Sequence, residues 1–170
     1  MIENSVKSII CGESVTIRPL LATDTALDAE FVRHLSVEAR RFRFFGSVKE
    51  LSAAELKLLC EVDGRQSMAY VATTQANGHE TAIGVSRYAL SLKDGAREMA
   101  LTIADEWQER GVAELLTAQL IEYAKCHGVK LLYSVELADN YAMQQLTKKL
   151  GMSAERDPDD ANQIIYSLTL

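Results

Sequence analysis

Proline, cysteine and long apolar runs are scarce in this chain of 170 residues. Only two prolines and nine glycines occur, which excludes collagen-like and low-complexity proteins. The three cysteines, Cys11, Cys60 and Cys126, are odd in number and form no Cys-x-x-Cys pair, which argues against disulfides and structural zinc. No stretch approaches the roughly 18 apolar residues that a membrane-spanning helix needs. We therefore expect a cytoplasmic protein without a metal and without a membrane partner.

Positive charge is also in deficit, because the formal net charge is -6 and the pI is near 5.1. This balance disfavours nucleic acid as a partner and favours cationic ones. Hydrophobic residues make up 48% and charged residues 25% of the chain, near the average of globular proteins. Length and composition predict one domain, residues 14–170, after an N-terminal arm of residues 1–13.

The order of hydrophobic patterns predicts a sheet covered by helices. Residues 14–20 alternate as a strand does, and residues 24–45 have the spacing of one or two short helices. Residues 52–55 form a Ser-x-x-Glu capping box before a further helix. Three β-branched runs, the first two separated by Asn77-Gly78, predict an antiparallel meander. Helix and strand patterns then alternate over residues 112–124, 130–137, 140–151 and 162–170, with one short strand near 153–156.

These elements give an α/β (α+β) fold class. We predict a three-layer mixed sheet of six to seven strands with helices on both faces. Asn140 is the expected N-cap of the helix at 140–151, and Gly128 the expected stop of the helix at 112–124.

Gly111 stands where an apolar run with helical spacing begins, although glycine is a poor helix former. The first turn of a helix holds N–H groups without intrahelical partners, backed by about half a positive charge, and it binds anions. Small residues at Gly111 and Ala113 would let a pyrophosphate settle against these amides, and Arg110 would add a charge-assisted bond. The alternative is that Gly111 only makes a tight turn. The chain has no P-loop or dinucleotide-binding glycine motif.

Two segments resemble the GNAT superfamily of N-acetyltransferases. Residues 108–113, QERGVA, resemble the Q/R-x-x-G-x-G/A motif that holds the pyrophosphate of acetyl-CoA in that family. Residues 140–152, NYAMQQLTKKLGM, are similar to its N-x-x-A-x-x-L-Y-x-K-x-G-F helix. The similarity extends over residues 14–170 and is closest to the GNAT domain of bacterial protein lysine acetyltransferases, on the segments RFRFFGSVKELS, MAYVAT and AREMALTIADEWQERG.

The resemblance implies that acetyl-CoA lies in a cleft where the strands of residues 96–104 and 130–137 splay apart. It implies that the backbone of Ile103 and Ala104 pairs with the pantetheine arm and that Asn140 reaches the cofactor. It further implies a phosphate cradle at the helix start and the turn before it, at Gln108, Glu109, Arg110, Gly111, Val112, Ala113 and Glu114.

Glu98 is the candidate general base. A lysine amine with a pKa of about 10.4 is protonated at neutral pH, so acetyl transfer needs a base. Glu98 interrupts an otherwise apolar strand, and the resembling lysine acetyltransferases place their catalytic glutamate at this offset before the glycine. Low-dielectric surroundings would raise the pKa of Glu98 toward the working range. The alternative is a solvated glutamate on an open sheet face.

The acid for the departing thiolate stays open. Many family members use a tyrosine where this chain has Thr147, whose hydroxyl is a far weaker acid. Tyr141 and Tyr133 are nearby alternatives, and a thiolate that leaves unassisted is another. The backbone N–H of Ile103 is the candidate oxyanion donor.

We predict an acetyl-CoA-dependent N-acetyltransferase that transfers directly to a protein lysine. A small-molecule amine or N-terminal acetyltransferase is the nearest alternative, and an acyl-CoA-binding regulatory module with little catalysis is one from another class. The basic and aromatic run at residues 40–45 is assigned to the acceptor side of the cleft, and Cys126 and His127 to packing and to a helix end. The oligomeric state is left open, a homodimer included.

Overall fold

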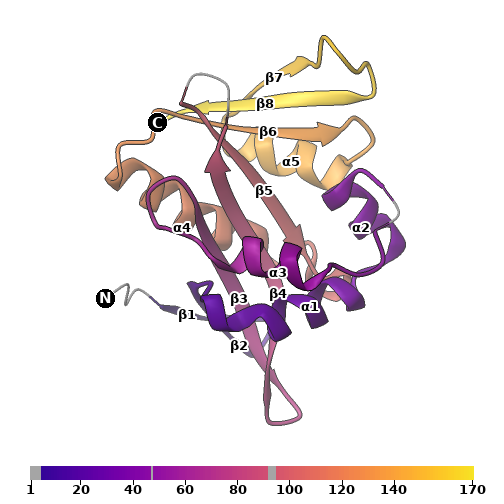
Figure 1. Cartoon of the computed structure of the whole chain (residues 1–170), viewed down its shortest axis with the longest axis vertical. Helices are drawn as coiled ribbons and strands as arrows, with labels where there is room; N and C mark the ends of the chain where they lie inside the picture. Colours follow the sequence, from indigo (N-terminus) through magenta and orange to yellow (C-terminus); the bar gives the residue numbers. More distant parts are fainter. Residues whose placement is uncertain (1–4, 47, 92–94) are drawn as a thin grey trace.

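A central sheet between two layers of helices organises the computed structural model, which describes residues 5–46, 48–91 and 95–170 (Figure 1). The eight strands of the described residues lie in the order β1-β2-β3-β4-β5-β6-β8-β7. Their bounds are β1 Val6–Ile10, β2 Glu13–Pro19, β3 Met68–Ala76, β4 His79–Leu90, β5 Arg97–Ile103, β6 Leu131–Leu137, β7 Ser153–Arg156 and β8 Gln163–Thr169. The helices are α1 Thr25–His34, α2 Val37–Phe44, α3 Ala53–Cys60, α4 Val112–Cys126 and α5 Tyr141–Lys149, with short 3₁₀ turns η1 Ala22–Asp24 and η2 Asp105–Trp107.

The pairing of β5 with β6 differs from every other pairing in the sheet. These two strands are parallel and pair only at Arg97 with Leu132 and Glu98 with Tyr133, whereas the other neighbours are antiparallel over longer stretches. Beyond these two pairs β5 and β6 diverge. The predicted splay of the two strands is therefore confirmed, and the predicted mixed sheet with it.

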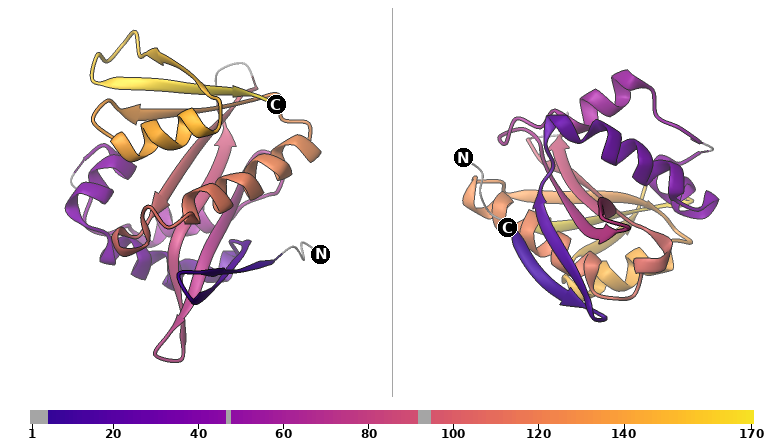
Figure 2. Two further views of the ribbon diagram at one scale, coloured as in Figure 1. Left: turned by 180° about the vertical axis from the view of Figure 1, so that it is seen from behind. Right: turned by 90° about the horizontal axis from the view of Figure 1, so that it is seen from below.

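Each face of the sheet has its own hydrophobic core. Helix α4 packs on β3, β4 and β5, and it buries Val112, Leu116, Leu120 and Ala124 at helical spacing. Helices α1, α2 and α3 lie on the opposite face, where Phe31, Val32 and Leu35 are among the residues of a second core. The views in Figure 2 show α4 and α5 on one side of the sheet and α1 to α3 on the other. The three-layer arrangement is confirmed.

Strand β1 corrects the prediction of an N-terminal arm over residues 1–13. Val6–Ile10 pairs with β2 at the edge of the sheet, and Cys11 and Gly12 form the connecting turn with φ values of 51° and 84°. A two-residue turn with two positive φ values joins antiparallel strands of the natural twist. Because β1 and β7 are both present, the sheet has eight strands instead of the predicted six to seven.

Local capping signals in the sequence are realised as predicted. Ser52 accepts from the amide of Glu55, whose carboxylate accepts from the amide of Ser52. Asn77 and Gly78 turn the chain between β3 and β4 with positive φ. Gly128 has a φ of 74° just after α4 ends. These signals depend only on neighbours in sequence, which is why they could be predicted.

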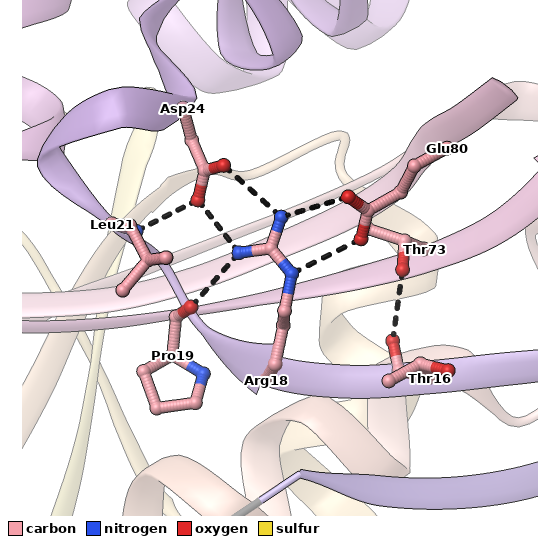
Figure 3. A network of polar contacts seen from close by, with 7 residues as sticks. All are labelled: Thr16, Arg18, Pro19, Leu21, Asp24, Thr73 and Glu80. Atoms are coloured by element: carbon pink, nitrogen blue, oxygen red, sulfur yellow. Dashed lines mark hydrogen bonds and ion pairs between the residues drawn. The ribbon is translucent and has the colours of Figure 1, made fainter. Parts of the chain in front are cut away.

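Arg18 joins β2 to η1 and to β4 through a network of polar contacts (Figure 3). Its guanidinium donates to Asp24 Oδ2 at 2.7 Å, to Glu80 Oε1 at 3.0 Å and to the carbonyl of Pro19 at 3.1 Å. Asp24 also accepts from the amide of Leu21 at 2.7 Å. Because Arg18 is 18% exposed and bonded to two carboxylates, its planar group fixes how the chain leaves β2 for the helical layer.

Replacing Arg18 with lysine is expected to lower the free energy of unfolding by about 1–2 kcal/mol. A lysine ammonium cannot make paired bonds to Asp24 and Glu80 at once. Urea denaturation measures the change. The matched control is Arg33→Lys, because Arg33 pairs with Glu50 at 3.6 Å and both side chains are largely exposed. Equal losses in the two variants would contradict the role of the network.

Candidate functional site

A cleft of about 370 Å³ lies where β5 and β6 diverge. Its walls come from these strands, from α2, from the start of α4 and from α5. Seven of the residues that the sequence assigned to catalysis or cofactor binding line it, namely Glu98, Ile103, Gln108, Glu109, Ala113, Glu114 and Asn140. The divergence of two parallel strands thus brings the two motif segments to one cavity, although they are separated in sequence.

The start of α4 is shaped by Gly111. This residue is the N-cap, with φ of 89° and ψ of 0°, and no side chain caps the helix from that position. A Cβ added at Gly111 would meet no atom within 4 Å. The positive φ confirms that Gly111 makes a tight turn, and the open space in front of the first amides is compatible with an anion there. The two interpretations of Gly111 therefore do not exclude each other.

The turn before α4 has a second residue with positive φ. Glu109 has a φ of 58° and lines the cleft. Glu109 and Gly111 thus both have left-handed backbone, so the turn bends sharply in front of α4. Val112 follows Gly111 and is fully buried in the α4 core, so only its backbone could contact a ligand.

Arg110 does not lie where the phosphate interpretation placed it. Its guanidinium is 5.2 Å from the ring centroid of Trp107 and 3.9 Å from Glu13 Oε1, and its side chain is not among those that line the cleft. The cation–π contact and the ion pair hold it toward β2. The predicted charge-assisted bond from Arg110 to phosphate is not supported by this geometry.

At the end of β5, the backbone groups of Ile103 and Ala104 point in different directions. The amide of Ala104 donates to Ile83 of β4 at 2.9 Å, and the carbonyl of Ala104 accepts from Trp107 at 2.8 Å. Both polar groups of Ala104 therefore have partners within the protein, and only the second lone pair of its carbonyl is available for the predicted pairing with pantetheine. The backbone N–H and C=O groups of successive residues in a strand point to opposite neighbouring strands. Because the N–H of Ala104 points to β4, the backbone groups of Ile103 and Leu101 face the gap toward β6.

Glu98 lines the cleft, but its surroundings differ from the expectation. Its side chain is exposed, so the low-dielectric environment predicted for it is not present. Its Oε2 accepts from the Tyr133 hydroxyl at 3.3 Å, and that hydroxyl lies 2.7 Å from Ser91 Oγ. Tyr133 therefore orients the Glu98 carboxylate at the point where β5 and β6 still pair.

The three residues considered for the acid have different positions. Thr147 is 1% exposed, donates to the carbonyl of Gln144 at 3.1 Å and does not line the cleft. Tyr133 is engaged with Glu98, and burial raises the pKa of its hydroxyl. Tyr141 lines the cleft and is 70% exposed. The Thr147 hydroxyl is thus buried outside the cleft.

Glu136 is a cleft residue that the sequence analysis missed. It is 8% exposed and accepts hydrogen bonds from the Ser134 hydroxyl and, at 3.2 Å, from Asn140 Nδ2. Burial raises the pKa of Glu136 to about 7, although both hydrogen bonds oppose the rise. The available signal is a carboxylate inside the otherwise largely apolar strand KLLYSVEL, residues 130–137. Its position against Asn140 depends on the contact between β6 and α5.

The two polar atoms of the Asn140 side chain have different partners. Its Oδ1 accepts from the amide of Met143 at 3.2 Å, which confirms the predicted N-cap of α5. Its Nδ2 donates to Glu136. Asn140 also lines the cleft, and the contact with the cofactor that the resemblance implies stays a prediction.

Two ion pairs link elements that form the cleft walls. Arg41 of α2 lies 3.0 Å from Asp139, just before α5, and Lys149 of α5 lies 2.8 Å from Glu114 of α4. Lys149 also lowers the pKa of Glu114. Both pairs are partly exposed, so we expect them to position the walls more than to stabilise the fold.

The remaining motifs fit the assignments made from sequence. Phe42, Arg43 and Phe45 of the basic and aromatic run line the cleft. The His127 ring stacks on Tyr123 with centroids 3.8 Å apart, whereas Cys126 is exposed, which corrects its assignment as packed. Among the described residues, no cluster of three or more His, Cys, Asp or Glu side chains is arranged to hold a metal ion. None of the described helices is long and apolar enough to cross a membrane.

Comparisons with known proteins show which family and fold this chain resembles. The acetyltransferase (GNAT) domain family matches residues 14–153. An acetyltransferase of Pseudomonas aeruginosa is 42% identical over 165 residues, which are 97% of this chain and 89% of that protein. The acetyltransferase Pat of Mycolicibacterium smegmatis is 31% identical over 141 residues, 82% of this chain but 41% of that longer protein. The crystal structure of the GNAT domain of S. lividans PAT has a TM-score of 0.87 at 21% identity, covering 98% of this chain and 97% of that one.

Proposed function

Because the chain belongs to the GNAT family of acetyltransferases, whose acyl donor is acetyl-CoA, we propose that it acetylates the side-chain amine of lysine in a protein. The observation that carries the proposal is the cleft itself. Glu98 lies where β5 and β6 still pair, and the start of α4 follows the far end of β5. A donor with a diphosphate at one end and a thioester at the other fits between them.

The donor is held mainly by backbone groups. Its diphosphate lies against the amides of residues 109–114, where the α4 dipole and the space in front of Gly111 favour an anion. Its pantetheine arm pairs with the backbone of Leu101 and Ile103, which faces the gap. The amide of Ile103 or Leu101 also donates to the oxyanion that forms on the thioester carbonyl.

Glu98 is the general base of the proposed reaction. Its carboxylate accepts a proton from the lysine ammonium, directly or through water, and the neutral amine attacks the thioester carbon. As the C–N bond forms, the attacking nitrogen gives up its second proton to water, the C–S bond then breaks, and no acetyl group is carried by the protein. Tyr133 supports this role because its hydroxyl bond orients Glu98.

Charge and exposure around the cleft favour a lysine of a protein as the acceptor. Among the described residues that line the cleft, acidic ones outnumber basic ones: only Arg43 and Lys149 are basic, against Glu38, Glu98, Asp105, Glu109, Glu114, Glu136 and Asp139. The chain also has a net charge of -6, so a cationic side chain is attracted. Phe45 and Tyr141 also line it and are 47% and 70% exposed, which offers apolar contacts to the residues around that lysine.

A regulatory module that binds acetyl-CoA with little catalysis is the second candidate. The observation that favours it is Thr147, which replaces the family's tyrosine and is buried outside the cleft. A slow chemical step with intact donor binding would identify such a module.

Incubation with acetyl-CoA and three separate acceptors tests the proposal. The acceptors are a lysine-rich protein, a polyamine and a lysine-free peptide with a free N-terminus, and free thiol and product mass are followed. We expect thiol release with the protein and acetylation of its lysine side chains. Thiol release only with the polyamine or the peptide would contradict the lysine proposal, and donor binding without thiol release would support the regulatory module.

A further inference from the structure

Glu136 and Glu98 line one cleft from opposite faces of the sheet. Tyr133, which donates to Glu98, and Ser134, which donates to Glu136, are neighbours on β6. Because side chains alternate across a strand, Tyr133 lies on one face of β6 and Ser134 and Glu136 on the other. A molecule that passes between the diverging strands therefore has one carboxyl group on each side.

The surroundings of the two carboxyl groups are unlike. Glu98 is exposed, whereas Glu136 is 8% exposed. Among the described residues, no Lys, Arg or His nitrogen lies within 4 Å of the Glu136 carboxylate, although such a pair would favour its charged form. Two carboxyl groups with environments that differ in this way are suited to opposite roles, one as base and one as acid.

Groups from several elements act on the charge of Glu136. Burial raises its pKa to about 7, and the Ser134 and Asn140 bonds and the charge of Arg43 on α2 oppose the rise. The charge of Glu98 on β5 adds to it. Burial raises the pKa of the Tyr166 hydroxyl on β8, and the nearby charge of Glu136 adds to that rise. Glu136 therefore keeps its proton to a higher pH than an ordinary carboxyl group does.

We propose that Glu136 is the general acid that protonates the departing sulfur of coenzyme A, an inference that rests on the acetyl transfer proposed above. As the C–S bond breaks, the electron pair stays on sulfur, which takes the proton from the Glu136 carboxyl group. Glu98 has received a proton from the acceptor amine, so the two residues end with exchanged protonation states. Proton exchange with solvent then restores both.

This assignment fills the role that Thr147 cannot take. Thr147 is buried and donates to the carbonyl of Gln144, and its hydroxyl is too weak an acid. A carboxyl group is a far stronger acid than a tyrosine hydroxyl. Glu136 accepts a hydrogen bond from Asn140, the N-cap of α5. Helix α5 also carries Thr147.

The variant Glu136→Gln tests the proposal through its pH profile. Glutamine keeps the shape of the side chain but has no proton to transfer. We expect kcat at pH 6.5 to fall about 100-fold, while the dissociation constant of acetyl-CoA stays within about twofold. In the wild type, kcat should decline above about pH 7 as Glu136 loses its proton. In the variant this alkaline decline should be absent.

Ser134→Ala is the matched control, because it leaves the carboxyl group in place. The Ser134 bond lowers the pKa of Glu136, so its loss should move the alkaline decline of kcat to higher pH. Below that decline kcat should fall by less than in Glu136→Gln, because the carboxyl group is still present. A merely structural role of Glu136 in holding Asn140 predicts no such shift.

The outcomes separate this inference from the proposed function. If the wild type acetylates lysine and Glu136→Gln keeps its rate, or loses rate but keeps the same alkaline decline, the acid role is wrong and the proposed function stands. If the wild type binds acetyl-CoA but none of the acceptors leads to thiol release, both the acid role and the proposed function are wrong.

The pH dependence of the melting temperature tests the protonation of Glu136 without an activity assay. The folded-state pKa of about 7 lies above the unfolded value of about 4.3, so the folded chain binds the extra proton in this window. The contribution of Glu136 to stability is therefore present below about pH 4.3 and is lost as pH rises through 7. The melting temperature should fall more from pH 5 to 8 in the wild type than in Glu136→Gln. Equal falls would show that the buried carboxyl group does not titrate as the proposal requires.

Discussion

Replacing Gly111 with aspartate is expected to weaken acetyl-CoA binding about 100-fold, or about 2.7 kcal/mol. An aspartate at the N-cap accepts hydrogen bonds from the first amides of α4 and places a negative charge in front of them. The open space at Gly111 would then hold a carboxylate where the diphosphate binds. Titration calorimetry with acetyl-CoA measures the loss.

Two variants serve as controls for that result. Gly111→Ala has the same unfavourable positive φ but neither caps the helix nor adds charge, so its loss of affinity should be much smaller. Gly128→Asp places the same side chain at another glycine with positive φ and open space, beyond the opposite end of α4. It should bind acetyl-CoA as the wild type does. Equal affinity of Gly111→Asp and the wild type for acetyl-CoA would show that the diphosphate does not bind at the start of α4.

Replacing Glu98 with glutamine is expected to lower kcat by about 10²- to 10⁴-fold, the usual contribution of a positioned base. The amide keeps the size of the side chain but does not accept a proton at neutral pH. Acetyl-CoA affinity should stay within about twofold, because Glu98 acts on the acceptor amine. Steady-state kinetics and calorimetry on the same sample measure both quantities.

Tyr133→Phe is the companion variant for Glu98. It removes the hydroxyl that donates to Glu98 and leaves the carboxylate in place, so kcat should fall by less than in Glu98→Gln. An unchanged rate in Glu98→Gln would assign the base to another group. A Tyr133→Phe variant as slow as Glu98→Gln would mean that the hydroxyl has a chemical role of its own.

The elements that could be predicted from sequence are those fixed by neighbouring residues. The cap of α5 at Asn140 and the turn at Gly111 follow from side-chain chemistry and backbone freedom within a few positions. The capping box of Ser52 and Glu55 is another case. β1 was missed because Cys11-Gly12 is not among the dipeptides that signal a tight hairpin, although its backbone adopts that geometry.

Long-range contacts explain where the site differs from the prediction. Arg110 turns toward Trp107 and Glu13, and the second of these lies far away in sequence. Ala104 donates to Ile83 of the neighbouring strand, a pairing set by the register of the sheet. Glu136 became a candidate because the contact between β6 and α5 places it in the cleft against Asn140, where burial raises its pKa. Motif spacing carries none of this information.

The most direct test compares the affinity of the wild type for acetyl-CoA with its affinity for S-acetyl-pantetheine, which lacks the diphosphate and the phosphoadenosine attached to it. If the amides at the start of α4 hold the diphosphate, calorimetry should give a dissociation constant at least about 100-fold higher for acetyl-pantetheine. Equal dissociation constants for the two donors would contradict this account of the cleft.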